Sequence, residues 1–397
     1  MRGAPGVLHH PSSLRGRSAQ WRRSLVTVTA STLTLCIALH FLRNLLVTPG
    51  QTAARGHMAL QGCENRLLAL GLMAGAELEG AAAGVSAEVQ HRRRLYASMA
   101  GDVTQGITVG GIITQGLTQN DLFEFHTTGR LIITQPNGSS SGSNIDAGFD
   151  MQRLHIAASA AGVQHQVAIT PVLRPLDVPV RAMILPLLNR SAAQLLAQAV
   201  EEVLMPVLAP GAIWKQDPGL YHATLFHASS HLKPVPAGSK EVLQEYAAIR
   251  AATSQLCPVA GVLERVVVTG TGVVVACWQA ASAGTEPMAL RKALAAALPN
   301  APPPDAQMVK DTTMLHTTLA RLLQPPAAVH GRDQPLDAGL VRRAVEAVSD
   351  RLCGLTTSFS EVWFVEEQDL LALALQGRYI KHPARLRCPA SLRARLA

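Results

Sequence analysis

Apolar residues recur with two spacings in the second half of the chain, and each spacing predicts one kind of element. Apolar runs bounded by polar residues or glycine predict strands; they lie at 180–187, 262–269, 273–279, 358–365 and 370–375. Helices are expected at 191–204, 239–252, 287–299 and 340–352. Apolar residues on one helical face predict the last of them, and Pro287 starts and Pro299 stops the third. Ser191 and Asp337 are placed to cap two of the helices. Strands outnumber helices and Gly270-Thr271-Gly272 predicts a hairpin, so we expect an α+β fold with antiparallel sheets.

Two further apolar segments repeat each other, and both contain the pattern His-x-Thr. They are 220–225 (LYHATL) and 314–319 (MLHTTL). In an extended strand alternate side chains point to the same face, so His222 lies beside Thr224, and His316 beside Thr318. The elements around the two strands come in a similar order. We therefore interpret the region as an internal duplication, with two lobes that face each other.

Two imidazoles and two hydroxyls around one small anion suit the cleavage of a phosphate ester. A neutral imidazole takes a proton from water or a ribose hydroxyl, and a protonated one gives a proton to the leaving oxygen. The threonine hydroxyls would hydrogen-bond the phosphate oxygens as negative charge builds. This chemistry requires no metal ion and no cofactor, and neither is predicted.

The same tripeptide pattern occurs elsewhere in the chain, because the sequence holds 14 histidines. It also begins at His10, His126 and His227. His126 is the strongest rival, since it follows an apolar stretch, but Gly129 comes directly after its motif. In a regular strand His227 would face away from His222, which predicts a core position.

The paired motifs, their spacing and their flanking strands resemble the 2H phosphoesterase superfamily. That group includes bacterial RNA 2′,3′-cyclic phosphodiesterases and plant cyclic nucleotide phosphodiesterases, and the resemblance covers about 181–383. Residues 217–231, 272–279 and 361–363 are similar to a membrane-anchored plant and algal branch. The resemblance implies duplicated antiparallel sheets with flanking helices. It also implies that His222 and His316 are the acid and base and that Thr224 and Thr318 bind the phosphate oxygens. RNA ligase activity would be the reverse reaction.

Aromatic and basic residues near the motifs are candidates for the remaining contacts with a nucleotide. Tyr221, Phe226 and Trp278 are predicted to bind substrate by stacking on a base, with Trp363 as a further candidate. The odd offset of Arg321 from His316 places it on the opposite strand face in a regular strand. The remaining anion-binding candidates are Arg265 and Arg378.

The charge distribution bears on the size of the substrate. The chain has a formal net charge of +8, but residues 1–63 contain seven arginines and no acidic residue, so the rest is nearly neutral. A neutral body lacks the counterion release that drives binding of long nucleic acids. We expect a monomer that binds a small cyclic-phosphate nucleotide or an RNA end.

The N-terminal residues predict a membrane anchor. Residues 24–42 contain no charged side chain, and arginines precede them, which favours a single-pass type II protein with a lumenal catalytic domain in the ER or Golgi. A cleaved signal peptide of a secreted protein and an organelle transit peptide are the alternatives. The predicted domains are a basic cytosolic tail (1–23), the anchor (24–47), an Ala/Gly/Thr-rich stem or small β module (48–178), the catalytic domain (179–385) and a basic tail (386–397).

The six cysteines show no zinc-binding spacing. We expect buried free thiols, with a Cys257–Cys277 bridge as the alternative. Sequons at Asn137 and Asn189 are compatible with a lumenal body.

Two other functions compete with a phosphodiesterase. Anchor, stem and lumenal body also describe type II membrane glycosyltransferases, but the sequence contains no Asp-x-Asp to hold a metal-bound sugar nucleotide. A non-catalytic nucleotide- or RNA-binding module on the same fold is the other alternative.

Overall fold

The computed structural model describes residues 62–73, 85–101, 112–114, 116–129, 131–134, 140–143, 165–325 and 336–389. The predicted basic tail at 1–23 and the predicted anchor at 24–47 lie outside these ranges, as does the sequon at Asn137. Among the described residues, no helix has the length and apolar character that a membrane crossing needs. The anchor therefore stays a prediction.

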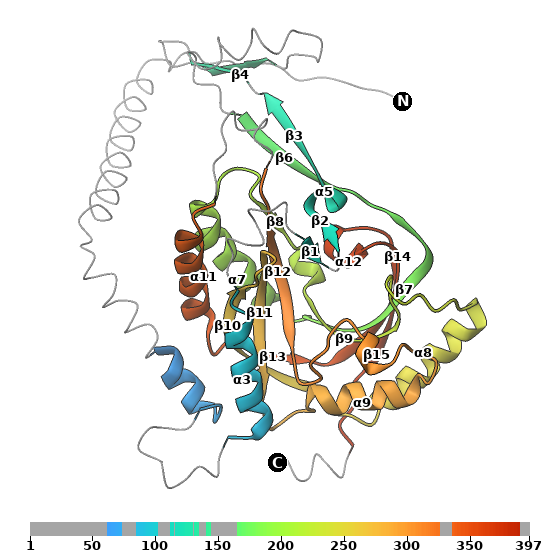
Figure 1. Cartoon of the computed structure of the whole chain (residues 1–397). Helices are drawn as coiled ribbons and strands as arrows, with labels where there is room; N and C mark the ends of the chain where they lie inside the picture. Colours follow the sequence, from blue (N-terminus) through green and yellow to red (C-terminus); the bar gives the residue numbers. More distant parts are fainter. Residues whose placement is uncertain are drawn as a thin grey trace, which may run out of the picture. The chain divides into compact units, whose positions relative to one another are not determined.

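Two sheets carry the predicted motifs (Figure 1). One has five strands in the order β13-β10-β11-β12-β8, and the other has four in the order β15-β14-β7-β9. The strands are β7 Pro175–Pro186, β8 Ile213–Lys215, β9 His222–Ser229, β10 Val259–Val268, β11 Val273–Ala280, β12 His316–Leu322, β13 Thr356–Phe359, β14 Glu361–Asp369 and β15 Tyr379–Arg385. All their pairings are antiparallel, which confirms the predicted α+β class.

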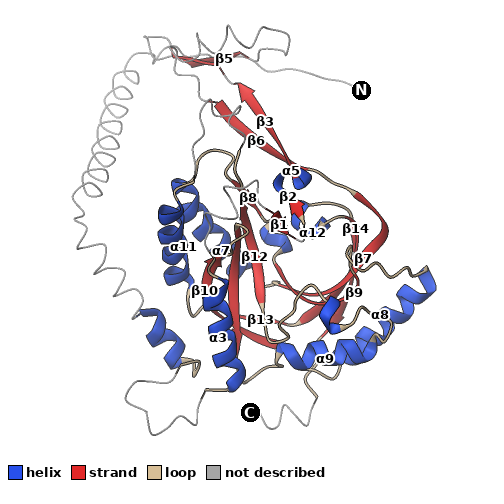
Figure 2. Cartoon of the chain, in the orientation of Figure 1, coloured by secondary structure: helices blue, strands red, loops and turns tan. Residues whose placement is uncertain are grey.

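Helices flank both sheets (Figure 2). The longer ones are α3 Ala87–Met99, α7 Arg190–Ala199, α8 Ser239–Thr253, α9 Pro287–Ala297 and α11 Ala338–Leu352. A π-helical turn (η1 Val200–Leu204) extends α7 against α11, α11 packs on β10, and α9 packs on β9. Asp337 caps α11 as predicted, because its Oδ1 accepts a hydrogen bond from Leu340 N at 2.9 Å. The cap of α7 is Asn189 rather than Ser191.

The predicted strand at 370–375 is wrong. These residues form a one-turn helix, α12 (Ala372–Leu375), and the last strand is β15. Leu371 and Gln376, on either side of α12, both have left-handed backbone conformations, with φ of 54° and 58°. That geometry ends the extended chain of β14 although the residues are apolar.

The region expected to form a separate stem contributes directly to the folded body. It contains the paired strands β1 Ile112–Thr114 with β2 Leu117–Thr118, β3 Phe123–Gly129 with β6 His165–Pro171, and β4 Leu131–Thr134 with β5 Ser140–Ser143, together with α5 Gln119–Leu122. The Gln119 side chain hydrogen-bonds both backbone groups of Gln324, just after β12. Leu122 and Phe123 share a hydrophobic cluster with Leu323. Part of the predicted stem therefore packs against the body.

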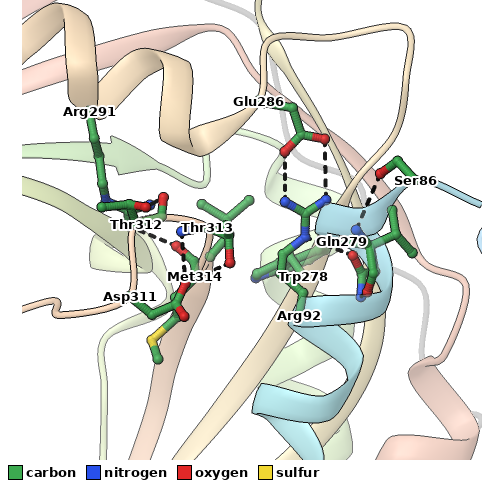
Figure 3. Close-up of polar contacts among 12 residues, drawn as sticks. Ser86, Arg92, Trp278, Gln279, Glu286, Arg291, Asp311, Thr312, Thr313 and Met314 are labelled. Atoms are coloured by element: carbon green, nitrogen blue, oxygen red, sulfur yellow. Dashed lines mark hydrogen bonds and ion pairs between the residues drawn. The ribbon is translucent and has the colours of Figure 1, made fainter.

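Helix α3 is also built into the body. Arg92 is fully buried, and its guanidinium donates to Gln279 Oε1 on β11 at 2.7 Å. Its two terminal nitrogens donate to the carboxylate of Glu286, which precedes α9, at 2.6 and 3.3 Å (Figure 3). Both contacts join residues more than 180 positions apart. Because a buried charge is stable only when paired, α3 depends on the body for its position.

Two disulfides replace the free thiols that we expected. Cys63, in a helix over 62–69, pairs with Cys353 after α11, and Cys257 pairs with Cys388 near the C-terminus. Cys277 remains free and buried, so the alternative Cys257–Cys277 bridge is also wrong. The bridges span 290 and 131 positions, and no local sequence pattern predicts such pairings.

Candidate active site

His222 is the first residue of β9, and a short turn fixes its approach. The turn is the 3-10 helix η3 (Pro218–Leu220), and the Asp217 side chain accepts a hydrogen bond from Gly219 N at 2.8 Å. His222 Nδ1 lies 2.7 Å from the carbonyl oxygen of Leu220. Because a carbonyl only accepts hydrogen bonds, Nδ1 carries a proton, and Nε2 is left for chemistry.

A β-bulge follows the first His-x-Thr motif. In the register of β9 with β7, Thr224 lies opposite Ile184 and Phe226 lies opposite Met183, so Leu225 is the extra residue. Leu225 and Phe226 both pack in the main hydrophobic core. The alternation of side chains is therefore reset after Thr224.

An equivalent bulge follows the second motif. In the register of β12 with β11, Thr318 lies opposite Val275 and Ala320 lies opposite Val274, so Leu319 is the extra residue. Both bulges thus fall on the leucine that comes directly after the motif threonine. The two strands therefore share a backbone irregularity as well as a sequence pattern.

The motif side chains occupy matching faces of the two strands. In β9, His222 and Thr224 are partly exposed, whereas Ala223 and Leu225 are buried. In β12 the same pattern places His316 and Thr318 on the open face, and Thr317 and Leu319 inside. The alternation predicted for each motif is confirmed up to the bulge.

Arg291 on α9 contacts the backbone of both motif segments; Figure 3 shows its contacts with Thr312 and Met314, just before β12. Its Nη2 donates to the Thr224 carbonyl of β9 at 3.0 Å and to the Met314 carbonyl, two residues before His316, at 2.7 Å. Its Nε donates to Leu225 O at 2.9 Å. One buried guanidinium therefore contacts both motif segments, and they lie within a few ångströms of each other.

The two histidines differ electrostatically. Burial, together with the positive charges of Arg291 and His222, lowers the pKa of His316 to about 4. Burial also lowers the pKa of His222, but its hydrogen bond to Leu220 O raises it in part. His316 is thus the more strongly neutral imidazole, and His222 accepts a proton more readily.

Arg321 lies on the same face as His316, contrary to the prediction. Because Leu319 is an extra residue, Arg321 pairs with Val273 of β11. Thr318 and His316 pair with Val275 and Cys277. Alternate residues of β11 share a face, so Arg321 lies on the same face as the motif side chains. Arg321 is 8% exposed, and its Nε and Nη1 have no hydrogen-bond partner among the described residues. Burial lowers the pKa of this guanidinium to about 10, so it stays charged. A buried cation without a carboxylate suits an anionic ligand.

His227 occupies the position in β9 that corresponds to Arg321 in β12. The bulge at Leu225 reverses the direction of its side chain too. It lies opposite Ala182, on the face that carries Thr224, rather than facing away as predicted. It is 5% exposed, and within the part of the chain that the structure describes its Nδ1 has no hydrogen-bond partner. Burial and the nearby His231 lower the pKa of His227 to about 4, so this third imidazole is neutral.

The three aromatic residues predicted to stack on a base lie in the core instead. Tyr221, Phe226 and Trp278 are 3, 7 and 0% exposed and belong to the main core cluster. Trp278 Nε1 donates to Thr317 Oγ1 at 3.0 Å, and its ring packs edge-on against Phe359. Rings buried in the core offer no surface for stacking, so we do not assign these residues to substrate.

The other candidate residues predicted from the sequence do not lie on β9 or β12. His126 is half-exposed on β3, which pairs only with β6 in its own small sheet. Arg265 and Arg378 are paired with the carboxylates of Glu264 and Asp369. Trp363 is buried, with Lys381 Nζ 3.9 Å from the centre of its ring.

Arg291 was not predicted, although the sequence holds a signal for it. The buried residues of α9 are Pro287, Leu290, Arg291 and Leu294, which follow the spacing of an apolar helix face. An arginine at such a position must find buried acceptors. The structure supplies four backbone carbonyls, from Leu225, Thr224, Thr312 and Met314.

An apolar cavity of about 530 Å³ lies elsewhere, between β6 and β8. Val167, Ile169, Leu208, Ile213 and Trp214 are among its lining residues, none of which belongs to either motif. We do not assign it to the reaction.

Comparison with known proteins identifies no family for this chain. No protein-family model, curated protein or solved structure matches the chain. The resemblance to the 2H phosphoesterases therefore stays a prediction from the motif residues.

Proposed function

We propose that this protein is a two-histidine phosphodiesterase of the 2H type, which opens 2′,3′-cyclic or related cyclic phosphates of nucleotides or RNA ends. The observation that carries the proposal is the matched pair of His-x-Thr strands, each with a bulge at the next leucine and both bound by Arg291. Imidazoles on both strands can supply the two proton transfers without a metal ion.

The electrostatic difference between the histidines assigns their roles in hydrolysis. His316, as the neutral base, takes a proton from water while the water oxygen forms a bond to phosphorus. The bond from phosphorus to one ribose oxygen breaks, and His222 gives its Nε2 proton to that oxygen. The product is a phosphomonoester, and a later proton exchange with water restores both histidines. Run in reverse with a 5′-hydroxyl in place of water, the same steps would ligate RNA.

Three side chains would stabilise the charge that builds on the phosphate. The hydroxyls of Thr224 and Thr318 share the faces of the two histidines, and the unpaired guanidinium of Arg321 supplies a positive charge. Preorganised donors of this kind stabilise a transition state because they need no reorganisation during the reaction.

The two disulfides support the proposed lumenal or secreted location of the body. Disulfides persist in oxidising compartments and are rare in the cytosol. A type II anchor and a cleaved signal peptide would both deliver the body to such a compartment.

The test is hydrolysis of 2′,3′-cyclic AMP by the full-length chain in EDTA. We expect His222→Ala and His316→Ala each to lower kcat by about 100- to 10,000-fold, the usual contribution of a general acid or base. His126→Ala is the matched control, because it removes the rival motif histidine from a half-exposed position, and it should leave kcat unchanged.

Two results would contradict the proposal. If the folded wild-type protein binds but does not hydrolyse cyclic nucleotides, RNA ends or cyclic phosphates of ADP-ribose, it is a binding module. If EDTA abolishes turnover, the two histidines do not suffice for the reaction.

A further inference from the structure

The segment that leads into β12 is held on one side by α9. Arg291 is 5% exposed and donates from Nη1 to Thr312 O at 2.6 Å and from Nη2 to Met314 O at 2.7 Å (Figure 3). The same guanidinium binds the carbonyls of Thr224 and Leu225 on β9. Since its planar fork fixes the directions of all these bonds, a displacement of one motif relative to the other would break some of them.

Helix α3 holds the same segment through Tyr96. This side chain is fully buried, and its hydroxyl accepts a hydrogen bond from Leu315 N at 3.0 Å. The hydroxyl also lies 2.7 Å from Trp278 O on β11. Tyr96 thus joins the backbones of β11 and Leu315, the residue directly before His316.

The two helices are themselves connected. Arg92 on α3 binds the carboxylate of Glu286, which immediately precedes α9. On the exposed side of α3, His91 Nε2 lies 2.6 Å from Asp311 Oδ2, at the start of the same segment. Residues 311–315 are therefore held by α3 and α9 together, and both helices lie outside the repeated motifs.

We propose that α3 and α9 form a brace that aligns His316 with His222, with Tyr96 and Arg291 as its positioning residues. The inference rests on the proposed phosphodiesterase function and adds α3, from the predicted stem, to the catalytic unit. Neither residue touches the reacting atoms. They act through the backbone of residues 312–315 and, on the β9 side, through the carbonyls of Thr224 and Leu225.

The brace has a catalytic consequence because acid–base chemistry depends on geometry. A displacement of about 1 Å can cost on the order of 100-fold in rate. The charge of Arg291 also helps keep His316 neutral, as a base must be. A group that serves only the stability of the fold would have neither effect.

The experiment compares Tyr96→Phe, Arg291→Lys and Arg291→Met in the full-length chain. Steady-state hydrolysis of 2′,3′-cyclic AMP is measured against pH. Thermal melts check that each variant is folded at the assay temperature. Tyr96→Phe should lower kcat by about 10- to 100-fold while KM changes by less than about twofold. Arg291→Lys keeps the charge but not the fork, so it should lower kcat and leave the pH profile in place.

Arg291→Met tests the charge. Without the guanidinium the pKa of His316 rises, so the acid limb of kcat/KM should move to higher pH. Selective NMR titration of His316 measures the same shift independently of turnover. It therefore still tests the Arg291 interaction if the wild-type protein proves inactive, an outcome that would reject the phosphodiesterase proposal instead.

Two matched variants separate positioning from stability. Tyr246→Phe removes a tyrosine hydroxyl that donates to Pro383 O at 2.7 Å, and Arg181→Lys alters a buried arginine bound to Glu245 and Val235 O. We expect both to keep wild-type kcat and pH dependence. The brace is rejected if Tyr96→Phe and Arg291→Lys match these controls in kcat, or if His316 titrates at the same pH in Arg291→Met as in wild type.

Discussion

Strands β9 and β12 carry the same motif and the same bulge, but their surroundings differ. β9 is an edge strand of the four-stranded sheet, and its histidine binds the carbonyl of Leu220. β12 lies inside the five-stranded sheet, and its histidine lies near the charge of Arg291. After the bulge, β9 presents neutral His227, whereas β12 presents charged Arg321.

Under the proposed function, this difference would let two similar strands serve an asymmetric reaction. Hydrolysis needs one protonated and one neutral imidazole, so two identical halves would be poorly suited to it. Here a carbonyl supports the protonated form of His222, and a guanidinium opposes the protonated form of His316. The shared bulges preserve the geometry, and the neighbouring residues divide the roles.

The largest difference between the strands should appear at the two residues after the bulges. Arg321→Met is expected to lower kcat/KM by about 100-fold, because it removes a preorganised cation from the phosphate site. His227→Leu should cost less than about 10-fold, the worth of one neutral hydrogen bond. Arg385→Met, at an exposed arginine, is the control and should show no change. Equal losses at both positions would contradict the asymmetry.

The pH dependence of the wild-type enzyme sharpens the assignment of acid and base. The proposed mechanism needs neutral His316 and protonated His222, so kcat/KM should fall below about pH 4 as His316 gains a proton. It should also fall on the alkaline side, with a midpoint below pH 6.5, as His222 loses its proton. His222→Ala should remove the alkaline limb and His316→Ala the acid limb; the opposite pattern would exchange the two roles.

A smaller effect is expected in the core beneath β12. Trp278→Phe loses the hydrogen bond to Thr317 and leaves a cavity in the core, so the free energy of unfolding should fall by roughly 2 kcal/mol. KM for the cyclic nucleotide should not change, because the ring lies inside the core. Urea unfolding and steady-state kinetics measure both quantities. A higher KM with unchanged stability would restore Trp278 as a stacking residue.

Local patterns in the sequence predict much of this fold. The spacing of apolar residues predicts α11, and alternation predicts that His222 and Thr224 share a face. A bulge depends on the pairing of two strands, so the orientations of His227 and Arg321 after it could not be predicted from one strand alone. The disulfides and the Arg92–Glu286 pair join distant residues and leave no local pattern.

The most direct test of the account is a double-mutant cycle on the two motif histidines. It compares kcat/KM for 2′,3′-cyclic AMP in wild type, His222→Ala, His316→Ala and the double variant. If both histidines act on one phosphate in one step, the double variant should be about as slow as the slower single variant. If the two losses multiply, the histidines act independently, and the shared site proposed for β9 and β12 is wrong.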